Sequence, residues 1–335
     1  MKKHPTIKDI AELLNLHHTT VSRALRDHPD VNPETRELVL ETARKYNYIP
    51  NSFAKSLRSA KSKTLVVMVP VVKNFFFSEV LGVISNRAIE EDFSVMIYQS
   101  NEKEEIESKN LDVIMENRVA GVIASVADGE ANREKYLQLT KLGIPVVLFD
   151  RCYANCSLPS IVIDNRRGAS EATGYLIASG RREIAFYRAK PGNPVFDSRF
   201  AGYVDALGAQ GIPYREDLVY EGGIGLEEGR RFVSKLSRRK RKADAALCSV
   251  DMVALGVITG ARELGLEIPD QLALIGFDDE PSGRIIRPAL TTVAQPVEQV
   301  GNTAFDLLMS QIRGTGELKE RETVLKMELI KRSSA

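Results

Sequence analysis

The hydrophobic pattern of this chain changes once, near residue 64, and the change divides it into two kinds of structure. Before that point, apolar residues recur at helical spacing in short segments, at residues 6–14, 18–25, 33–46 and 51–58. After it, short apolar runs alternate with helical stretches of about twelve residues or more. A chain of 335 residues is also too long for one ordinary core. The sequence therefore predicts a small all-α head followed by a larger α/β body.

The first three head helices begin in ways that predict how they are arranged. Thr6 stands three residues before Asp9, as in a capping box with Asp in place of Glu. Asn32 followed by Pro33 is a strong start for the third helix. The first two helices are joined by a turn of about three residues, the spacing of a helix-turn-helix that offers its second helix to a DNA major groove. A plain three-helix bundle shows the same spacing.

The second helix divides into two faces. Its apolar side consists of Val21, Ala24 and Leu25. The opposite side carries His18, Thr19, Ser22 and Arg23. Hydroxyl and imidazole groups bond phosphates or base edges, and a guanidinium can donate two hydrogen bonds to guanine. Outward polar residues are equally what any solvated helix shows.

The fourth segment begins after Pro50, where Asn51 can cap a helix of about eight residues, too short to be stable alone in water. Ala54 and Leu57 are its apolar residues, flanked by Lys55 and Arg58. A leucine between cations suits a wedge inserted into a DNA minor groove beside phosphates. The alternative is that Leu57 packs on the following domain.

Charge is distributed unevenly along the chain. Residues 1–63 hold 12 Lys and Arg against 7 Asp and Glu, whereas the remainder holds 34 against 38. A basic head on a mildly acidic body suits a module that binds a polyanion, although charge runs are usually solvated helix faces. The run at residues 238–242 is open to both interpretations, and a solvated loop is the favoured one.

Several classes of protein are disfavoured by the sequence. No apolar stretch is long enough to span a membrane, and the N-terminus lacks an apolar export signal. Cys152, Cys156 and Cys248 lack metal-site spacing, so we expect reduced thiols and neither a metal nor a cofactor. No histidine follows His28, and no P-loop, G-x-S-x-G or H-E-x-x-H motif is present. We therefore expect a cytoplasmic, nucleoid-associated protein that is not an enzyme.

The body shows two series of buried strands, which predict two doubly wound parallel sheets. The strands are expected at residues 65–70, 93–98, 121–125, 145–150, 160–164, 183–188, 217–221, 245–249 and 272–278. Ligands of such folds bind beyond the carboxyl ends of the strands. Polar and aromatic residues gather there, and our candidates for ligand contact are Phe75, Phe76, Ser125, Asp150, Arg151, Asp164, Arg199, Asp251 and Asp278. Carboxylates, a guanidinium and aromatic rings fit a polyhydroxylated ligand, although the aspartates could simply cap helices and the phenylalanines could be core.

The whole chain resembles the LacI/GalR family of bacterial transcription regulators. The resemblance rests on "TIKDIAELLNLHHTTVSRAL" and "AKSLR" in the head, and on "RFAGYVDAL", "DMVALG", "IGFDD" and "PALTTVAQP" in the body. It implies a periplasmic-binding-protein-like core behind the head, with a helix-turn-helix domain at 1–50 and a hinge helix and linker at 51–63. The first lobe would comprise 64–164 and 294–321, and the second 165–293 and 322–335.

The resemblance also implies roles for individual residues. His18, Thr19 and Arg23 would read bases, with Thr20 and Ser22 near the backbone. Thr6 and the hinge residues Asn51, Ala54, Lys55 and Arg58 would contact DNA, with Leu57 intercalated at the centre of a two-fold operator. Arg199 and Asp278 would bind the effector. His17 and Val250 depart from the family, which often has Ser at the first position and, in sugar-binding members, Asn at the second.

We therefore predict a homodimeric regulator, most simply a repressor, whose affinity for pseudo-palindromic operator DNA is set by a small molecule, a sugar or sugar derivative, between the lobes. The sequence does not distinguish a molecule that releases the protein from DNA from one that strengthens its binding to DNA. A transport-type solute-binding protein would need an export signal and no head. A carbohydrate-processing enzyme would need two carboxylates about 5–10 Å apart across a cleft, which Asp150, Asp164 and Asp278 leave open.

Overall fold

A computed structural model describes residues 5–48, 62–127, 129–153, 156–239, 242–315 and 321–335. The chain forms two compact units, Met1–Ser62 and Lys63–Ala335. The helix predicted at residues 51–58, with Asn51, Ala54, Lys55, Leu57 and Arg58, lies outside the described residues. Among the described residues, no helix has both the length and the apolar character needed to cross a bilayer.

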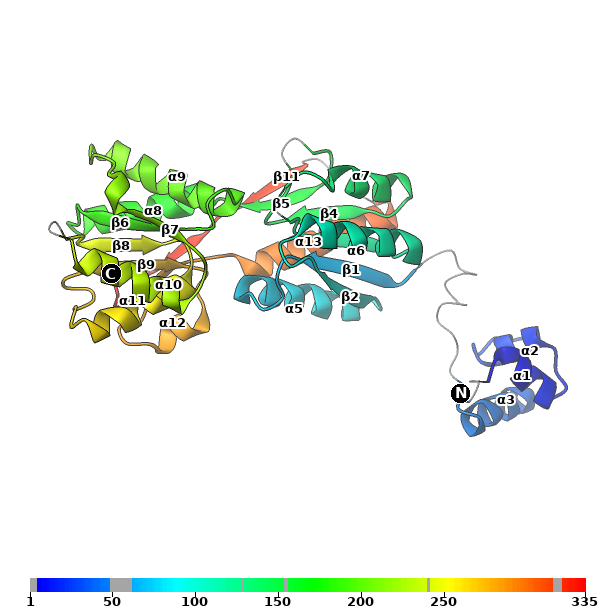
Figure 1. Cartoon of the computed structure of the whole chain (residues 1–335). Helices are drawn as coiled ribbons and strands as arrows, with labels where there is room; N and C mark the ends of the chain where they lie inside the picture. The colour runs from blue at the N-terminus through cyan, green and yellow to red at the C-terminus, as the bar shows by residue number, and fades with distance from the viewer. Residues whose placement is uncertain (1–4, 49–61, 128, 154–155, 240–241, 316–320) are drawn as a thin grey trace. The chain divides into compact units, whose positions relative to one another are not determined.

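The head contains three helices, α1 (Ile7–Leu13), α2 (His18–Ala24) and α3 (Pro33–Lys45), as labelled in Figure 1. Their bounds lie within one residue of the predicted ones, because the capping residues act as expected. The Asp9 amide donates to Thr6 Oγ1 at 3.3 Å, and the Thr6 amide donates to Asp9 Oδ2 at 2.6 Å, which completes the capping box. The Thr35 amide donates to Asn32 Oδ1 at 2.7 Å.

The head core differs from prediction at one position. Ile10, Val21, Ala24 and Val39 are buried, as amphipathic helices require. Ser22, predicted on the outward face of α2, is only 9% exposed. The reason is that α2 packs against both α1 and α3, so it buries a wider arc than one apolar stripe. The prediction that Ser22 lies on the outward face was therefore wrong.

The first lobe of the larger unit is built on a six-stranded sheet in the order β11-β5-β4-β3-β1-β2, with every neighbouring pair parallel. Its strands are β1 (Thr64–Val69), β2 (Ser94–Gln99), β3 (Gly121–Ala124), β4 (Val146–Phe149), β5 (Ser160–Ile163) and β11 (Glu322–Leu325). Its helices are α5 (Phe75–Glu90), α6 (Glu104–Asn117), α7 (Arg133–Lys141) and α13 (Val297–Arg313).

The second lobe repeats this plan with the order β12-β10-β9-β8-β6-β7, and only β12 runs antiparallel to its neighbour. Its strands are β6 (Ile184–Ala189), β7 (Val219–Gly222), β8 (Ala245–Cys248), β9 (Ala273–Phe277), β10 (Thr291–Ala294) and β12 (Glu328–Ile330). Its helices are α8 (Asn165–Ala178), α9 (Pro194–Ala209), α10 (Leu226–Ser237), α11 (Asp251–Glu263) and α12 (Pro281–Ile285), with a 3-10 turn, η1 (Glu216–Leu218). The two predicted doubly wound lobes are thus confirmed.

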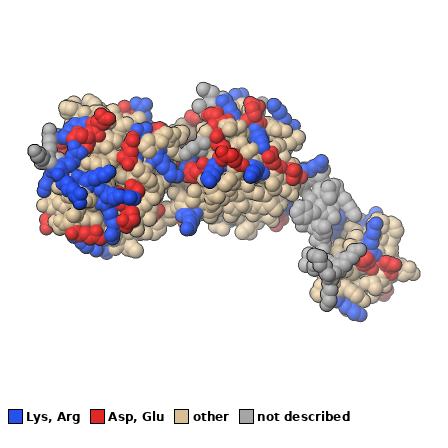
Figure 2. All heavy atoms as spheres, in the orientation of Figure 1, with Lys and Arg blue, Asp and Glu red and all other residues tan. Residues whose placement is uncertain are grey.

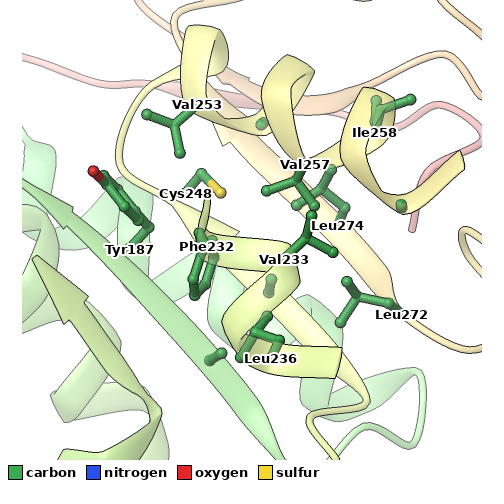
Figure 3. Packing of buried hydrophobic residues seen from close by; sticks show 14 of the residues in the cluster. Tyr187, Phe232, Val233, Leu236, Cys248, Val253, Val257, Ile258, Leu272 and Leu274 are labelled. Atoms are coloured by element: carbon green, nitrogen blue, oxygen red, sulfur yellow. The ribbon is translucent and has the colours of Figure 1, made fainter. Parts of the chain in front are cut away.

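The central strands of both sheets are buried on both faces, because alternate residues of each strand face opposite helix layers. In β1, Val67 packs with α5 and α13, whereas Val66 and Met68 pack with α6. In the second lobe, α8 and α9 cover one face and α10 and α11 the other. Figure 3 shows this last layer, where Phe232 and Val257 meet the sheet.

The helices α10 and α11 approach unusually closely, and two glycines allow it. A Cβ at Gly229 would lie 2.0 Å from the Val253 carbonyl oxygen, and one at Gly256 would lie 2.0 Å from that of Leu226. A side chain at either position would force the helices apart, so the spacing of α10 and α11 is fixed by backbone packing.

The chain crosses between the lobes at three places, after β5, after β10 and between β11 and β12. The predicted lobe boundary at residue 322 was wrong, because β11 pairs with β5 in the first sheet. The crossing lies at Lys326 and Met327, between β11 and β12. The boundary at residue 294 also shifts, because Ala294 pairs with Glu328 in the second sheet.

Candidate functional site

The outward surface of α2 is the candidate nucleic-acid interface. Thr19 and Arg23 are exposed, and His18 and Thr20 are half-buried. The Arg23 guanidinium lies 3.8 Å from the Asp30 carboxylate, with both side chains more than half exposed. Such an exposed pair contributes little stability, so Arg23 can exchange Asp30 for another acceptor at small cost.

Two other head residues have defined neighbours. Thr6 is exposed, and its hydroxyl donates to Asp9 Oδ2 at 2.9 Å as part of the α1 cap. His17 is the N-cap of α2, but its side chain makes no capping hydrogen bond. Its Nδ1 instead lies 2.8 Å from Thr19 Oγ1.

The second candidate site lies where the strands of the two lobes end. Arg199 on α9 is its centre and is 1% exposed. Its Nε donates to Asn165 Oδ1 at 2.8 Å, and its Nη1 donates to the Ser249 carbonyl at 2.6 Å. The guanidinium lies over the Phe277 ring at 4.4 Å. Four neighbouring groups therefore fix one orientation of this cation, the fourth being Asp278, 3.4 Å from Nη1.

Two aspartates after β4 and β9 share this region. Asp278 Oδ1 accepts from Gln295 Nε2 at 2.6 Å. Asp150 is less well bonded: Ser125 Oγ donates to its Oδ2 at 3.4 Å, and Arg151 Nε lies 3.9 Å away. Burial raises the pKa of Asp150 to about 6, against the influence of the Arg151 and Arg199 charges. Burial also raises the pKa of Asp278.

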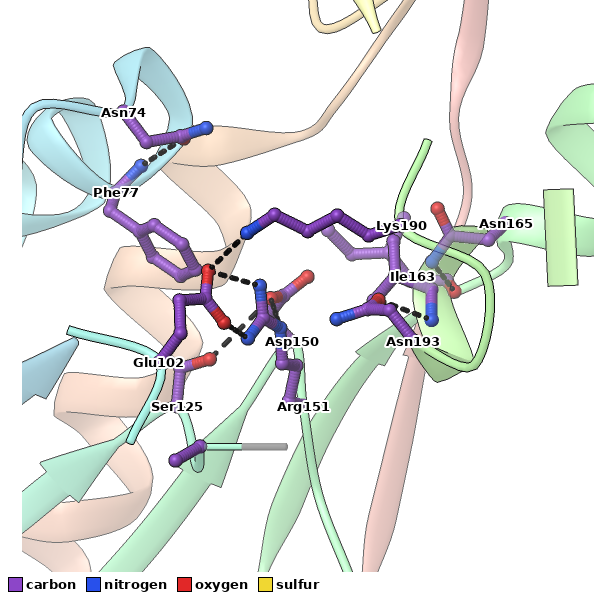
Figure 4. Close-up of polar contacts among 12 residues, drawn as sticks. Asn74, Phe77, Glu102, Ser125, Asp150, Arg151, Ile163, Asn165, Lys190 and Asn193 are labelled. Carbon is purple, nitrogen blue, oxygen red and sulfur yellow. Dashed lines mark hydrogen bonds and ion pairs between the residues drawn. The ribbon is translucent and has the colours of Figure 1, made fainter. Parts of the chain in front are cut away.

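An ion pair joins the lobes beside Asp150, as Figure 4 shows. Glu102, after β2, accepts from Lys190, after β6, at 3.1 Å. Glu102 also pairs with Arg151, whose Nη2 lies 3.2 Å from its Oε1. Burial opposes ionisation of Glu102, but Arg151 and Lys190 together bring its pKa below the ordinary value.

The backbone at these strand ends is held in an uncommon conformation. Four of the cleft residues have positive φ: Lys190 (40°), Asp150 (61°), Glu102 (61°) and Asp278 (116°). Non-glycine residues seldom adopt such angles, and they persist where surrounding structure fixes them, often at binding sites.

Three of the other predicted ligand contacts, Asp164, Asp251 and Phe76, have structural roles in this chain. Asp164 caps α8, accepting from the Arg167 amide at 3.1 Å. Asp251 is fully buried and accepts from Thr292 Oγ1 at 2.7 Å and from the Glu280 amide at 2.9 Å. Phe76 is 4% exposed in the first-lobe core, whereas Phe75 is half-buried. Among the predicted residues, Ser125, Asp150 and Arg151 form one polar group and Arg199 and Asp278 form a second, and the charges of Arg199 and Asp278 both act on Asp150.

Sequence reasoning missed four further members of these two groups: Glu102, Asn165, Lys190 and Gln295. Glu102 and Lys190 follow strands β2 and β6, so the rule that found Asp150 could have found them. Gln295 and Asn165 lie on crossings between the lobes, and only the path of the chain reveals them.

The basic run before β8 belongs to a solvated surface in its described part. Arg239 bonds the Tyr220 hydroxyl at 3.0 Å and pairs with Asp217. Along α10, Arg231 pairs with Glu228 at 2.5 Å. Figure 2 shows the cations over α10 interspersed with acidic side chains. The structure thus supports the solvated interpretation of the described residues in this run.

Comparison with known proteins covers both units. Residues 6–51 match the model of bacterial regulatory proteins of the lacI family, and residues 173–335 match a periplasmic binding protein-like domain. The catabolite control protein A of Priestia megaterium is 34% identical over 304 residues, 90% of this chain and 91% of that protein. The ribose operon repressor of Halalkalibacterium halodurans is 31% identical over 307 residues, 92% of this chain and 90% of that protein.

Solved structures give the same result for the fold. The crystal structure of a transcriptional regulator of the lacI family from Silicibacter pomeroyi superposes with a TM-score of 0.85 at 26% identity. The match covers 98% of this chain and 99% of the other.

Proposed function

The chain belongs to the LacI family of DNA-binding transcriptional regulators, which are not enzymes. We propose that it is a repressor controlled by a small polyhydroxylated molecule, a sugar or sugar derivative, that binds between the two lobes of its core. The observation that carries this proposal is the poorly bonded, buried carboxylate of Asp150, on which the charge of the fixed Arg199 guanidinium acts.

The chemistry of the cleft supports a ligand rich in hydroxyl groups. The Asp150 carboxylate is nearly buried and accepts no hydrogen bond shorter than 3.4 Å from the described residues, and such an acceptor is costly unless a ligand donates to it. Arg199 and Asp278 offer a donor and an acceptor side by side. One hydroxyl can donate to one of the two carboxylates while it accepts from Arg199, so a ligand with two or more hydroxyls can serve all three groups. The ribose operon repressor among the relatives is in keeping with a sugar.

The same residues connect the proposed ligand site to the segments that join the two lobes, so a bound ligand could change how the lobes close. Arg199 bonds Asn165, whose Nδ2 donates to the carbonyl of Ile163 at 3.0 Å, at the first crossing between the lobes. The Glu102–Lys190 pair spans the lobes directly. A ligand that binds one closure better than the other shifts operator affinity by that difference, typically about 1–3 kcal/mol.

On the DNA side, we assign base reading to His18, Thr19 and Arg23, with Thr6 and Thr20 at the phosphates. Ser22 is buried and at most contacts the backbone from the edge of α2. The residues at 51–58 would form the hinge helix, with Asn51, Ala54, Lys55 and Arg58 beside the minor groove and Leu57 in it.

A homodimer fits the surface of the first lobe. The edge strand β2 exposes Met96 by 41% and Ile97 by 51%, so it presents apolar side chains on both faces beside unpaired backbone groups. Such an edge is normally covered, and a second copy related by two-fold symmetry would place two heads on a pseudo-palindromic operator in the cytoplasm.

Two linked measurements test the proposal. Genomic fragments bound by the purified protein are sequenced against random competitor DNA, and mono- and oligosaccharides and nucleobases are screened for a rise in its melting temperature. We expect an enriched two-fold sequence and a sugar that both stabilises the protein and changes its affinity for that sequence. Absence of any enriched fragment, with and without cell extract, would contradict the function.

A further inference from the structure

His17, the residue that departs from the family pattern at the start of α2, is in contact with a proposed base-reading side chain. Its Nδ1 lies 2.8 Å from Thr19 Oγ1, and its ring lies 4.3 Å from that of His18, centroid to centroid. Both His17 and Thr19 are exposed. The contact therefore sits on the surface assigned to the major groove, and not in the head core.

The contact constrains what Thr19 can offer to a base. A threonine hydroxyl has one hydrogen to donate and two lone pairs to accept with. Among the described residues, the hydrogen-bond partner of Thr19 Oγ1 is Nδ1 of His17. If Nδ1 accepts, the hydroxyl hydrogen is used, and only lone pairs remain for the base. If Nδ1 donates, the hydrogen stays available.

We propose that His17 is a specificity-determining residue that orients the Thr19 hydroxyl, with Nδ1 accepting its hydrogen, so that Thr19 acts on DNA as an acceptor only. Thr19 lies in the first turn of α2, where no preceding helical turn supplies a carbonyl for its hydroxyl. Nδ1 is the acceptor that replaces it. The other ring nitrogen then carries the proton, with solvent as its acceptor.

The consequence is a predicted operator base. In the major groove, adenine and cytosine present amino groups that donate, whereas guanine and thymine present only acceptors. An acceptor-only Thr19 therefore favours adenine or cytosine on the strand that it faces. This inference rests on the proposed placement of Thr19 in the major groove.

The test is a binding selection from operators randomised at each position, with the full-length wild type and three variants. Thr19→Val removes the hydroxyl, and His17→Phe removes Nδ1 while keeping a ring beside His18. We expect wild type to prefer adenine or cytosine at one position by about threefold to tenfold. His17→Phe should flatten the preference at that position alone, because a freed hydroxyl can donate or accept. The double variant His17→Phe/Thr19→Val should have the same base preference at that position as Thr19→Val alone, because His17 acts through the Thr19 hydroxyl.

Tyr46→Phe is the matched control, because it removes an exposed polar atom from α3 in the same head. Its base preferences should equal those of wild type, and all variants should keep the wild-type melting temperature. A preference for guanine or thymine, or one unchanged by His17→Phe, would overturn the inference while leaving the proposed function intact. Binding without preference for any sequence would instead contradict the function itself.

Discussion

The polar residues of the head and those of the cleft are held in opposite ways. On α2, Thr19 and Arg23 are exposed, and Arg23 has only a loose 3.8 Å pair with Asp30. In the cleft, Arg199 is buried and fixed by Asn165 and the Ser249 carbonyl. The difference suits two kinds of ligand. A long polyanion supplies partners that exposed side chains adjust to, whereas a small molecule must find its partners already in place.

The largest expected contrast between the two regions is in their response to salt. Operator binding should weaken about a thousandfold between roughly 50 and roughly 200 mM salt, because phosphate contacts release counterions. Effector binding should change little over that range, because the proposed ligand is uncharged and buried charges are screened by salt much less than exposed ones. Titrations of both ligands across a salt series measure this, and equal salt slopes would remove the distinction.

The next largest effect is expected at the buried cation. Arg199→Ala leaves Asp278 buried without its ion partner, so the core should lose about 3–5 kcal/mol of unfolding free energy. The effector response should be abolished, while operator affinity of the folded protein is retained. Denaturant unfolding and operator binding with and without effector measure this. Arg166→Ala, in an exposed pair with Asp205, is the control and should leave both unchanged. A normal effector response in Arg199→Ala would remove Arg199 from the pocket.

The ionised Asp150 carboxylate should lower the stability of the ligand-free core and strengthen effector binding. Its pKa is raised to about 6, so the folded state holds the proton more tightly than the unfolded chain between about pH 4 and 6. Stability conferred by the protonated form is therefore lost as the pH rises through 6. Asp150→Asn should stabilise the ligand-free core by about 2–3 kcal/mol at pH 8 and not at pH 4.

Effector binding should show the opposite pH dependence. The wild type should lose effector affinity as the pH falls below 6, because a protonated carboxyl is a poorer acceptor, and Asp150→Asn should bind weakly at every pH. Unfolding curves and calorimetric titrations at both pH values measure the two effects. Asp205→Asn, in the exposed pair with Arg166, is the control. A stability gain that does not depend on pH would argue against a buried, uncompensated charge at Asp150.

The sequence predicts a residue's structural role well when that role depends only on neighbouring residues in the chain. It predicts the role poorly when distant elements decide it. Thr6 and Asn32 cap their helices as predicted, because a cap needs only residues within one turn. Ser22 was misplaced because two neighbouring helices, and not the helix itself, decide its burial. The strand β11 was assigned to the wrong lobe because its four residues carry no periodicity that identifies their sheet.

The candidate site divides in the same way. The sequence predicts Asp150 as a site residue because it follows a strand, and it predicts Arg199 because it lies in a motif that resembles the family's. Asp164 stands at an equivalent strand end but caps α8, and the sequence pattern is the same for both roles. The Glu102–Lys190 pair joins residues 88 positions apart and depends on how the lobes close, which no local pattern encodes.

In the hinge, Leu57→Ala should weaken operator binding by at least about tenfold and reduce DNA bending, because the wedge that unstacks a base step is lost. Dimerisation and effector binding should be unaffected. Anisotropy and circular-permutation bending assays measure this, with Leu38→Ala, a half-exposed leucine on α3, as the matched control. Unchanged operator affinity would count against the wedge.

The smallest effect is expected from the ion pair between the lobes. Lys190→Ala removes a partly exposed pair with Glu102 and should change effector affinity only about twofold to fivefold, with little change in stability. Lys135→Ala, in the first lobe, removes a pair with Asp112 that does not join the lobes and should leave effector affinity unchanged. If Lys190→Ala and Lys135→Ala changed effector affinity equally, the Glu102–Lys190 pair would contribute no more to effector binding than a pair within one lobe.

The central claim is that the cleft and the head are coupled, and reciprocity tests it most directly. Operator affinity is measured with and without saturating effector, and effector affinity with and without saturating operator. The two ratios should be equal and lie between about fivefold and about 150-fold, because linkage requires one coupling free energy for both. An operator affinity that stays the same when the cleft is saturated would contradict the account.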